Sequence, residues 1–185
     1  MKEVVLGVTG SIAAYKAADI VNLLAKNNIS VHVIMTNAAT KFIAPLTFQT
    51  LTKNKVYVDI FEEIAYSDVR HISLAQRADC CVIAPATANI IGKIASGIAD
   101  DMLSTVVMAV GNKPVIICPA MNTAMYENAV VQGNIAKLKS HGYRFVEPRE
   151  ALLACGDTGK GALADVNVIV AAIMAAVEEK QKGDE

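Results

Sequence analysis

Asn122 and Met121 are the residues whose types and position most strongly indicate a binding site. They end the string Pro119-Ala120-Met121-Asn122, which follows an apolar run at residues 115–118. A short apolar run that stops at proline predicts a buried strand, and ligands of an open parallel sheet bind just beyond the carboxyl ends of its strands. Asn122 is therefore placed to hydrogen-bond a ligand and Met121 to pack against one. The alternative is that Asn122 only caps a helix over residues 123–139.

A second candidate site lies at the turn Gly10-Ser11, between a predicted strand at residues 4–9 and a predicted helix at residues 12–27. Gly10 permits a tight turn, Ser11 can cap the helix, and the first N–H groups of a helix attract anions. The Gly-x-Gly-x-x-Gly spacing of dinucleotide-binding proteins is absent, and no acidic residue follows the second strand at the ribose position. The turn thus favours a mononucleotide phosphate, with an ordinary strand-to-helix turn as an equal alternative.

Hydroxyl side chains also end the second and third predicted strands. Thr36 follows the strand at residues 31–35, and Thr87 follows the strand at residues 80–84, just ahead of Ala88-Asn89-Ile90. The carboxyl ends of parallel strands share one edge of a sheet, so these residues and Ser11 should outline one crevice. Such a crevice suits a flat polar ring that carries a phosphate.

His71 and Cys155 are the candidates for proton transfer. His71 stands in a polar stretch ahead of an apolar helical turn, and histidine titrates near neutral pH. Cys155 is the only one of the four cysteines in a glycine-rich loop, where a thiol can close over a substrate and donate a proton. The alternatives are a structural histidine and a free surface thiol.

Alternating strands and helices must position these residues. We predict strands at residues 4–9, 31–35, 80–84, 115–118 and 144–146, and helices at residues 12–27, from 38, 45–51, 89–95, 104–110, 123–139 and 166–179. This alternation predicts an α/β protein with one doubly wound parallel sheet and helices on both faces. Residues 1–185 show no repeat and no linker, so we expect a single domain. Residues 147–165 lack periodicity and predict a long functional loop.

Composition limits the class of protein. The hydrophobic fraction is 54% and the mean hydropathy is +0.39, which fits strands buried on both faces or an apolar oligomer interface. No apolar run is long enough to span a bilayer, and a net charge of −1 does not suggest a nucleic-acid or membrane partner. No signal peptide precedes the first strand. The four cysteines form no Cys-x-x-Cys pair and the three histidines are scattered, so we expect a cytoplasmic protein without a metal site.

Together, the motifs resemble those of the flavin-dependent cysteine decarboxylases. The resemblance covers residues 4–177 and rests on six strings: Gly10-Ser11-Ile12-Ala13-Ala14-Tyr15-Lys16, His71-Ile72-Ser73-Leu74, Ala84-Pro85-Ala86-Thr87-Ala88-Asn89, Gly97-Ile98-Ala99-Asp100-Asp101-Met102-Leu103, Pro119-Ala120-Met121-Asn122 and Ala154-Cys155-Gly156-Asp157. It implies a Rossmann-like, flavodoxin-like fold, noncovalently bound FMN, and assembly as a trimer or a multiple of trimers.

The resemblance also implies roles for individual residues. His71 would be the base, Cys155 the acid, and Asn122 would bind the substrate carboxylate, with Met121, Leu153 and Ala154 beside the substrate. The implied FMN contacts are Gly10, Ser11, Ile12, Thr36, Thr87, Ala88, Asn89, Ile90 and Ala120. The implied reaction is FMN-dependent decarboxylation of a small-molecule substrate, 4'-phospho-N-pantothenoylcysteine, to 4'-phosphopantetheine in coenzyme A biosynthesis.

Two alternatives and two departures accompany the resemblance. The alternatives are a peptidyl-cysteine decarboxylase and a non-catalytic flavin-binding regulatory subunit. Many members have Gly-x-Gly-Arg-Met-Ala in the loop, whereas this chain has Gly159-Lys160-Gly161-Ala162-Leu163-Ala164. The arginine is absent, and Lys160 is the nearest cation in the loop. In many bacteria this domain is fused to a ligase, so the chain is either free-standing or part of a fusion.

Overall fold

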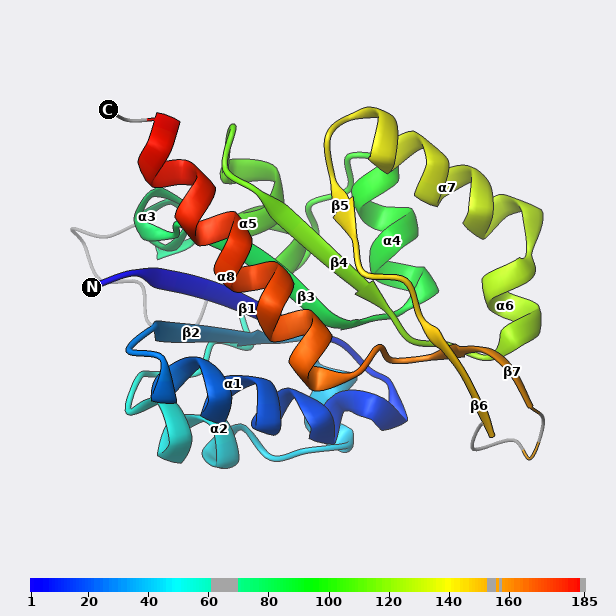
Figure 1. The fold of residues 1–185 in the computed structure, drawn as a ribbon, viewed down its shortest axis with the longest axis horizontal. Coiled ribbons are helices and arrows are strands. Elements are labelled where there is room, and N and C mark those ends of the chain that lie inside the picture. The colour runs from blue at the N-terminus through cyan, green and yellow to red at the C-terminus, as the bar shows by residue number, and fades with distance from the viewer. Residues whose placement is uncertain (61–69, 153–155, 157, 184–185) are drawn as a thin grey trace.

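A five-stranded parallel sheet forms the centre of the molecule (Figure 1). The computed structural model describes residues 1–60, 70–152, 156 and 158–183. The strand order is β2-β1-β3-β4-β5, with all neighbours parallel. This order is the flavodoxin-like form of the doubly wound sheet, which confirms the predicted fold class. The strands are β1 (Glu3–Val8), β2 (Ser30–Met35), β3 (Cys80–Ala86), β4 (Val115–Pro119) and β5 (Arg144–Phe145).

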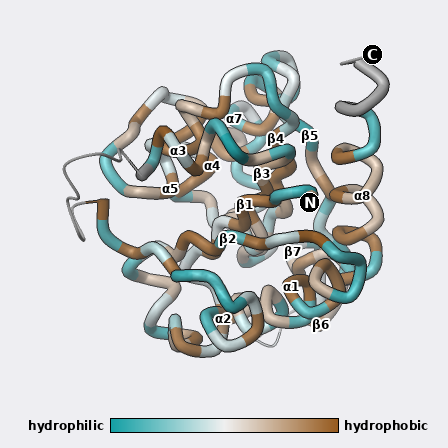
Figure 2. Tube along the Cα trace, turned by 90° about the vertical axis from the view of Figure 1, so that its left-hand side faces the viewer, coloured by the Kyte–Doolittle hydropathy of each residue, from teal (hydrophilic) through white to brown (hydrophobic). Residues whose placement is uncertain are grey.

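Both faces of the sheet are buried, which explains the high hydrophobic fraction. Side chains alternate along each strand, so Val4, Leu6 and Val8 enter one core while Val5 enters the other. Figure 2 shows hydrophobic segments along these inner strands. All seven residues of β3, at the centre, are buried. Strands buried on both faces have continuous apolar sequences, which is why the sequence revealed them.

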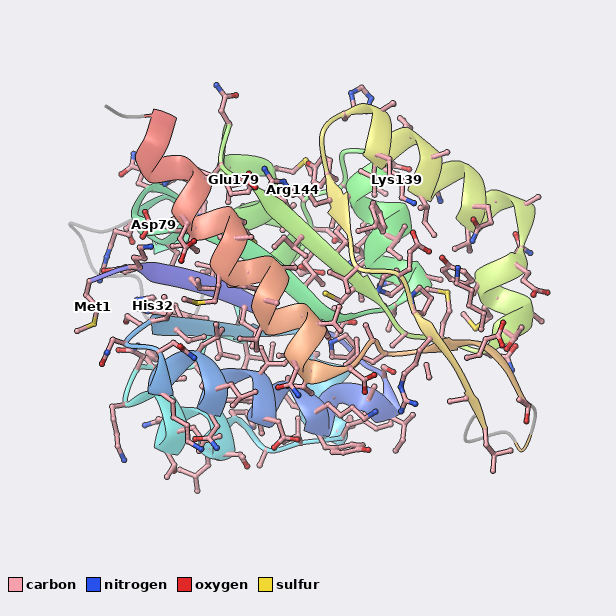
Figure 3. The ribbon with its side chains drawn as sticks, in the orientation of Figure 1. Met1, His32, Asp79, Lys139, Arg144 and Glu179 are labelled. Atoms are coloured by element: carbon pink, nitrogen blue, oxygen red, sulfur yellow. The ribbon has the colours of Figure 1, made fainter. Side chains whose placement is uncertain are left out.

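Helices cover the two faces in separate groups. The first core contains α1 (Lys16–Lys26), α2 (Pro45–Thr52) and α8 (Val166–Gly183), with the short helices η1 (Ile12–Tyr15) and η2 (Ala39–Lys41) near its edge. The second core contains α3 (Arg70–Arg77), α4 (Ala88–Ala95), α5 (Met102–Ala109) and α7 (Ala129–Ser140). Arg144 on β5 and Glu179 on α8 form an exposed ion pair of 2.7 Å (Figure 3). No helix in the described ranges is long and apolar enough to cross a membrane.

The structure corrects two predictions of secondary structure. The predicted helix at residues 123–139 is two helices, α6 (Thr123–Glu127) and α7, because Asn128 ends one and caps the other with its side chain on the Val130 N–H. The predicted loop at residues 147–165 contains an antiparallel hairpin, β6 (Arg149–Leu152) and β7 (Thr158–Ala162). Its glycine-rich second strand hides the alternation by which strands are usually found.

Thr9 joins the ends of β1 and β3 at the carboxyl edge of the sheet. Its side chain is buried, with 1% exposure. The hydroxyl donates to the Pro85 carbonyl at 2.7 Å and accepts from the Thr87 N–H at 3.1 Å. Both backbone groups lie in the segment that leads from β3 into α4. The Thr9 side chain therefore sets the distance between the turn that follows β1 and the turn that follows β3.

We expect Thr9→Val to destabilise the fold and to loosen this edge. The isosteric change leaves the Pro85 carbonyl and the Thr87 N–H without their partner, at about 1–3 kcal/mol for each buried group. Denaturant unfolding measures the loss. The control is Thr50→Val, because the exposed Thr50 hydroxyl donates only to the Leu46 carbonyl within α2. Equal stability of the two variants would contradict the structural role of Thr9.

Candidate functional site

Two cavities lie at the carboxyl edge of the sheet, where the sequence predicted one crevice. The first cavity, of about 520 Å³, lies among the η1 turn, the end of β4 and the β6–β7 hairpin. The second cavity, of about 540 Å³, lies among the ends of β1, β2 and β3 and the start of α4. Gly10 lines the second and Ser11 the first. The turn between these adjacent residues therefore separates the two spaces, and both volumes are typical of small-molecule sites.

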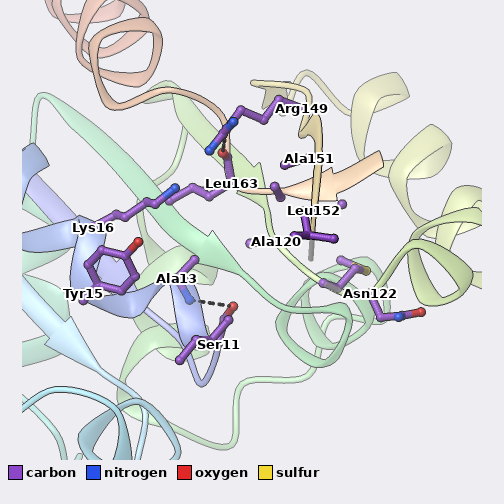
Figure 4. Close-up of a pocket in the computed structure, with 14 residues that line it drawn as sticks. Ser11, Ala13, Tyr15, Lys16, Ala120, Asn122, Arg149, Ala151, Leu152 and Leu163 are labelled. Carbon is purple, nitrogen blue, oxygen red and sulfur yellow. Dashed lines mark hydrogen bonds between the residues drawn. The ribbon is translucent and has the colours of Figure 1, made fainter. Parts of the chain in front are cut away.

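The first cavity contains the predicted substrate residues Asn122 and Met121 and the predicted cofactor residues Ser11, Ile12 and Ala120 (Figure 4). Asn122 is half-buried, and its Oδ1 accepts from the Ala124 N–H at 2.8 Å. Asn122 is therefore a helix cap and also lines the cavity, and its binding of a ligand stays a prediction. The cap fixes the orientation of its side chain beside the cavity. Ser11 likewise caps η1 by accepting from the Ala13 N–H at 3.3 Å.

The β6–β7 hairpin is docked directly onto the Pro-Ala-Met-Asn segment. The Met121 N–H donates to the Gly161 carbonyl at 2.9 Å. A Cβ atom on Gly161 would lie 2.2 Å from the Met121 carbonyl oxygen, so only glycine fits at this approach. Gly161 interrupts the alternating pattern by which strands are recognised in a sequence. The same residue lets the hairpin approach closely enough to form one wall of the cavity.

The second cavity contains the remaining predicted cofactor residues: Gly10, Thr36, Thr87, Ala88, Asn89 and Ile90. The Thr36 hydroxyl accepts from the Ala39 N–H at 3.2 Å and the Thr87 hydroxyl from the Ile90 N–H at 3.5 Å, so each caps the chain that follows its strand. A Cβ atom on Gly10 would lie 2.5 Å from the Ala38 Cβ, which explains the glycine there. The walls are apolar and the rim carries hydroxyls, an amide and helix N–H groups.

Lys93 and Asp101 supply the charges of the second cavity. Lys93 Nζ lies 2.6 Å from Asp100 Oδ1 and 2.9 Å from Asp101 Oδ2. Burial opposes ionisation of Asp101, but hydrogen bonds from Ser104 and Lys93 outweigh it and hold the pKa of Asp101 below its usual value. The Asp100 and Asp101 hydrogen bonds raise the pKa of Lys93. The two charges therefore compensate each other, and the cavity stays polar with little net charge.

His71 lies at the beginning of α3 and lines neither cavity. It is half-buried. Helix α3 packs near α5, toward the end of the sheet at which β1 begins (Figure 1). The other predicted catalytic residue, Cys155, and the predicted substrate residues Leu153 and Ala154 lie outside the described residues.

Three cysteines, Cys80, Cys81 and Cys118, are buried free thiols. Burial raises their pKa values, which leaves them unreactive.

Arg149 and Lys16 were not among the predicted site residues, although they are the charged residues in the described lining of the first cavity. Arg149 lay in a stretch predicted to be a loop, so no pattern placed it at a site. Lys16 lay inside a matched motif but was given no role. Its place at the start of α1, about one helical turn after Ser11, could have indicated that it lines the same cavity. Lys160 lines neither cavity, because its Nζ lies 3.3 Å from Glu147 Oε2.

Glu147 connects the hairpin to α6 and α7. Its carboxylate lies 2.7 Å from Lys139 Nζ and 3.3 Å from Lys160 Nζ, and accepts a short hydrogen bond from the Tyr126 hydroxyl. Partial burial opposes its ionisation, but Lys139 and Tyr126 outweigh burial and lower the pKa of Glu147 to about 2. Burial and the neighbouring carboxylate raise the pKa of Tyr126 to about 12. The carboxylate thus stays charged across the physiological range.

A family model described as Flavoprotein matches residues 1–178. The chain is similar to the probable phosphopantothenoylcysteine decarboxylase of Streptococcus mutans serotype c, with 48% identity over 170 residues that cover 91% of this chain and 95% of that protein. It is also similar to the coenzyme A biosynthesis bifunctional protein CoaBC of Bacillus subtilis, with 48% identity over 91% of this chain. There the match spans only 41% of the bifunctional protein.

Solved structures show the same fold. A PPC decarboxylase cysteine-to-serine mutant complexed with pantothenoylaminoethenethiol has a TM-score of 0.86 and 30% identity, over 96% of this chain and 98% of that one. The FMN-dependent cysteine decarboxylase SpaF has a TM-score of 0.82 and 32% identity, over 95% of this chain and 97% of that one.

We expect Glu147→Gln to loosen the β6–β7 hairpin and to remove one component of the pH dependence of stability. The pKa of Glu147 is lowered from an ordinary 4.5 to about 2, so its stabilisation is complete above about pH 4.5 and is lost as the pH falls through about 2. Exposed pairs are screened, and the effect should be about 1 kcal/mol or less.

Hydrogen exchange of the hairpin amides and acid unfolding test this prediction. Glu127→Gln is the control, since it removes the same charge from an exposed position in the neighbouring helix. Identical hairpin protection in wild type, Glu127→Gln and Glu147→Gln would show that the ionic contacts do not hold the hairpin.

Proposed function

This chain belongs to the Flavoprotein family, and from that membership we propose that it decarboxylates 4'-phospho-N-pantothenoylcysteine with FMN, giving 4'-phosphopantetheine. The observation that carries the proposal is the 48% identity that extends over 95% of the phosphopantothenoylcysteine decarboxylase relative. A likeness confined to the sheet would support only a shared fold. The aligned region shared with this relative also includes the docked hairpin and the Pro-Ala-Met-Asn segment, which surround the first cavity.

The residues at the carboxyl edge fit FMN by their chemistry. Thr36, Thr87 and Asn89, together with the first N–H groups of α4, offer donors to a phosphate and a ribityl chain. Met35, Met102 and Leu103 offer an apolar wall to a flat ring. Ser11, Ile12 and Ala120 would hold the cofactor from the first cavity, and Gly10, Ala88 and Ile90 from the second. The FMN-dependent neighbour SpaF supports this identity of the flavin.

In the proposed reaction the protein orients the substrate and moves protons. When bound, FMN would supply the redox chemistry, by accepting a hydride from the thiol-bearing carbon of the cysteine and later returning one. Asn122 holds the departing carboxylate, with Met121, Leu153 and Ala154 against the rest of the cysteine. His71 removes a proton during oxidation. Loss of carbon dioxide leaves its electron pair on the C=S group as an enethiolate. Cys155 would then protonate the carbon next to the sulfur-bearing carbon, which receives the hydride. The neighbour in which a cysteine-to-serine mutant holds an enethiol supports this last role.

The reaction as proposed requires more than one protomer. Asn122 lines the first cavity, whereas His71, on α3, is not among the described residues that line either cavity. We propose that a neighbouring protomer supplies His71 in a trimer or a multiple of trimers. Large apolar side chains around the first cavity are exposed, including Ile12 at 61%, Tyr15 at 56% and Leu152 at 73%. Such a patch is typical of a protein interface.

Two other functions are weighed against this one. A peptidyl-cysteine decarboxylase would share the roles of His71 and Asn122 but bind a peptide. A flavin-binding regulatory subunit would not need the proton-transfer residues that this chain retains. We also propose a cytoplasmic location, because buried free thiols such as Cys118 persist in reducing compartments.

We expect the purified protein to be yellow, to release FMN on denaturation, and to produce carbon dioxide from phosphopantothenoylcysteine. Mass spectrometry should identify the saturated 4'-phosphopantetheine. A peptide that ends in cysteine is the comparison substrate. Faster turnover of the peptide would favour the peptidyl-cysteine decarboxylase, and flavin binding without turnover of either substrate would favour the regulatory subunit.

We expect His71→Asn and Asn122→Asp to be inactive alone but active when co-expressed. Asn122→Asp retains an oxygen to cap α6 while repelling a carboxylate, so it should fold. If one protomer supplies His71 and its neighbour Asn122, random mixing leaves roughly a quarter of the sites with both native residues. Purification through two different tags isolates the mixed oligomers, whose turnover is then measured. Mixed oligomers as inactive as their parents would place both residues in the same protomer.

A further inference from the structure

We propose that Lys16 and Arg149 form a phosphate-binding subsite in the first cavity, which recognises the terminal phosphate monoester of the substrate. The inference rests on the proposed function and deepens it, because it names the residues that select a phosphorylated substrate over one that ends in an uncharged group. It also identifies what replaces the arginine that the loop lacks at position 162, where this chain has alanine.

The charge of the first cavity carries the inference. Among the residues that the structure describes, Lys16 and Arg149 are the charged ones that line this cavity, and no described aspartate or glutamate lines it. Neither cation forms a salt bridge within the described part of the chain. Lys93 and Lys160, which lie near the two cavities, are by contrast paired with carboxylates. Two uncompensated cations in one cavity, in a chain of net charge −1, point to an anionic ligand.

The two cations come from different elements. Lys16 begins α1, and Arg149 begins β6 of the docked hairpin. In Figure 4 their side chains point toward one another across Leu163. Arg149 Nε donates to the Leu163 carbonyl at 3.3 Å, which orients the guanidinium and leaves its two terminal nitrogens for another acceptor. A guanidinium and an ammonium together suit a dianionic phosphate.

The position of the pair matches the charges of the substrate. Asn122 lies on the opposite side of the cavity from Lys16 (Figure 4), and the lining between them includes Ala120, Ala151 and Leu163. The proposed substrate carries a carboxylate at its cysteine end and a phosphate at its other end, with an uncharged chain between. The amide would receive the carboxylate and the cations the phosphate.

Kinetics with phosphopantothenoylcysteine and with dephosphorylated pantothenoylcysteine test the subsite in the flavin-loaded protein. We expect wild type to prefer the phosphorylated substrate. Arg149→Gln should raise KM for it by about tenfold to hundredfold, as for a lost hydrogen bond to a charged group. KM for the dephosphorylated substrate and kcat for both should change little. Arg149→Lys should restore part of the preference, and Lys16→Gln should reduce it.

The control is Arg144→Gln, which removes the same charge from an exposed residue paired with Glu179 outside both cavities. Calorimetric binding of 4'-phosphopantothenate against pantothenate gives the same comparison without turnover. An unchanged preference in both Arg149→Gln and Lys16→Gln overturns the proposal. Loss of FMN from Arg149→Gln, with the substrate preference unchanged, assigns the cations to the cofactor phosphate and also overturns it. Failure of wild type to turn over either substrate would instead refute the proposed function.

Discussion

The buried hydroxyl of Thr9 is the contact on which the carboxyl edge of the sheet depends. It bridges the carbonyl of Pro85 and the N–H of Thr87, which belong to a segment far away in the sequence. On one side of this bridge the chain turns at Gly10 and Ser11 into η1, and on the other it enters α4. Both cavities open beside these turns. A buried hydroxyl with both of its hydrogen-bonding functions used holds one geometry, which a purely apolar contact would not specify.

Much of this arrangement could be predicted from the sequence because local rules determine it. The inner strands are buried on both faces, so their apolar runs were clear, and Ser11, Thr87 and Asn122 cap helices where small polar residues favour caps. The hairpin was missed because Gly159 and Gly161 are required by close packing against Thr123 and Met121, a tertiary constraint that leaves no periodic pattern. The division into two cavities was missed for a similar reason, since it depends on how the turn at Gly10 and Ser11 lies relative to the strand ends and the hairpin.

The hairpin determines what the first cavity can recognise. It contributes Arg149, Ala151 and Leu152 to the wall, and its docking on Met121 brings them opposite the residues of η1. Lys160 of the hairpin pairs with Glu147 and so helps to hold the hairpin in place. Arg149 of the hairpin lines the cavity instead. Under the proposal, Arg149 would supply the charge that many family members have in an arginine at the position of Ala162. The charge of a cavity depends on which charged side chains line it. A residue on a neighbouring strand can therefore supply that charge.

The position of His71 outside the described lining of the first cavity is the observation that links the proposed chemistry to the proposed assembly. A proton-transfer group must come within about 3 Å of the atom it serves, and His71 is not among the described residues that line the first cavity. Exposed apolar side chains surround that wall, including Ile12, Tyr15 and Leu152. Burying them against another protomer would remove apolar surface from water and close the cavity to solvent in the same step. The high hydrophobic fraction of this chain reflects a sheet that is covered on both faces, and the proposed assembly would add an apolar interface around the first cavity.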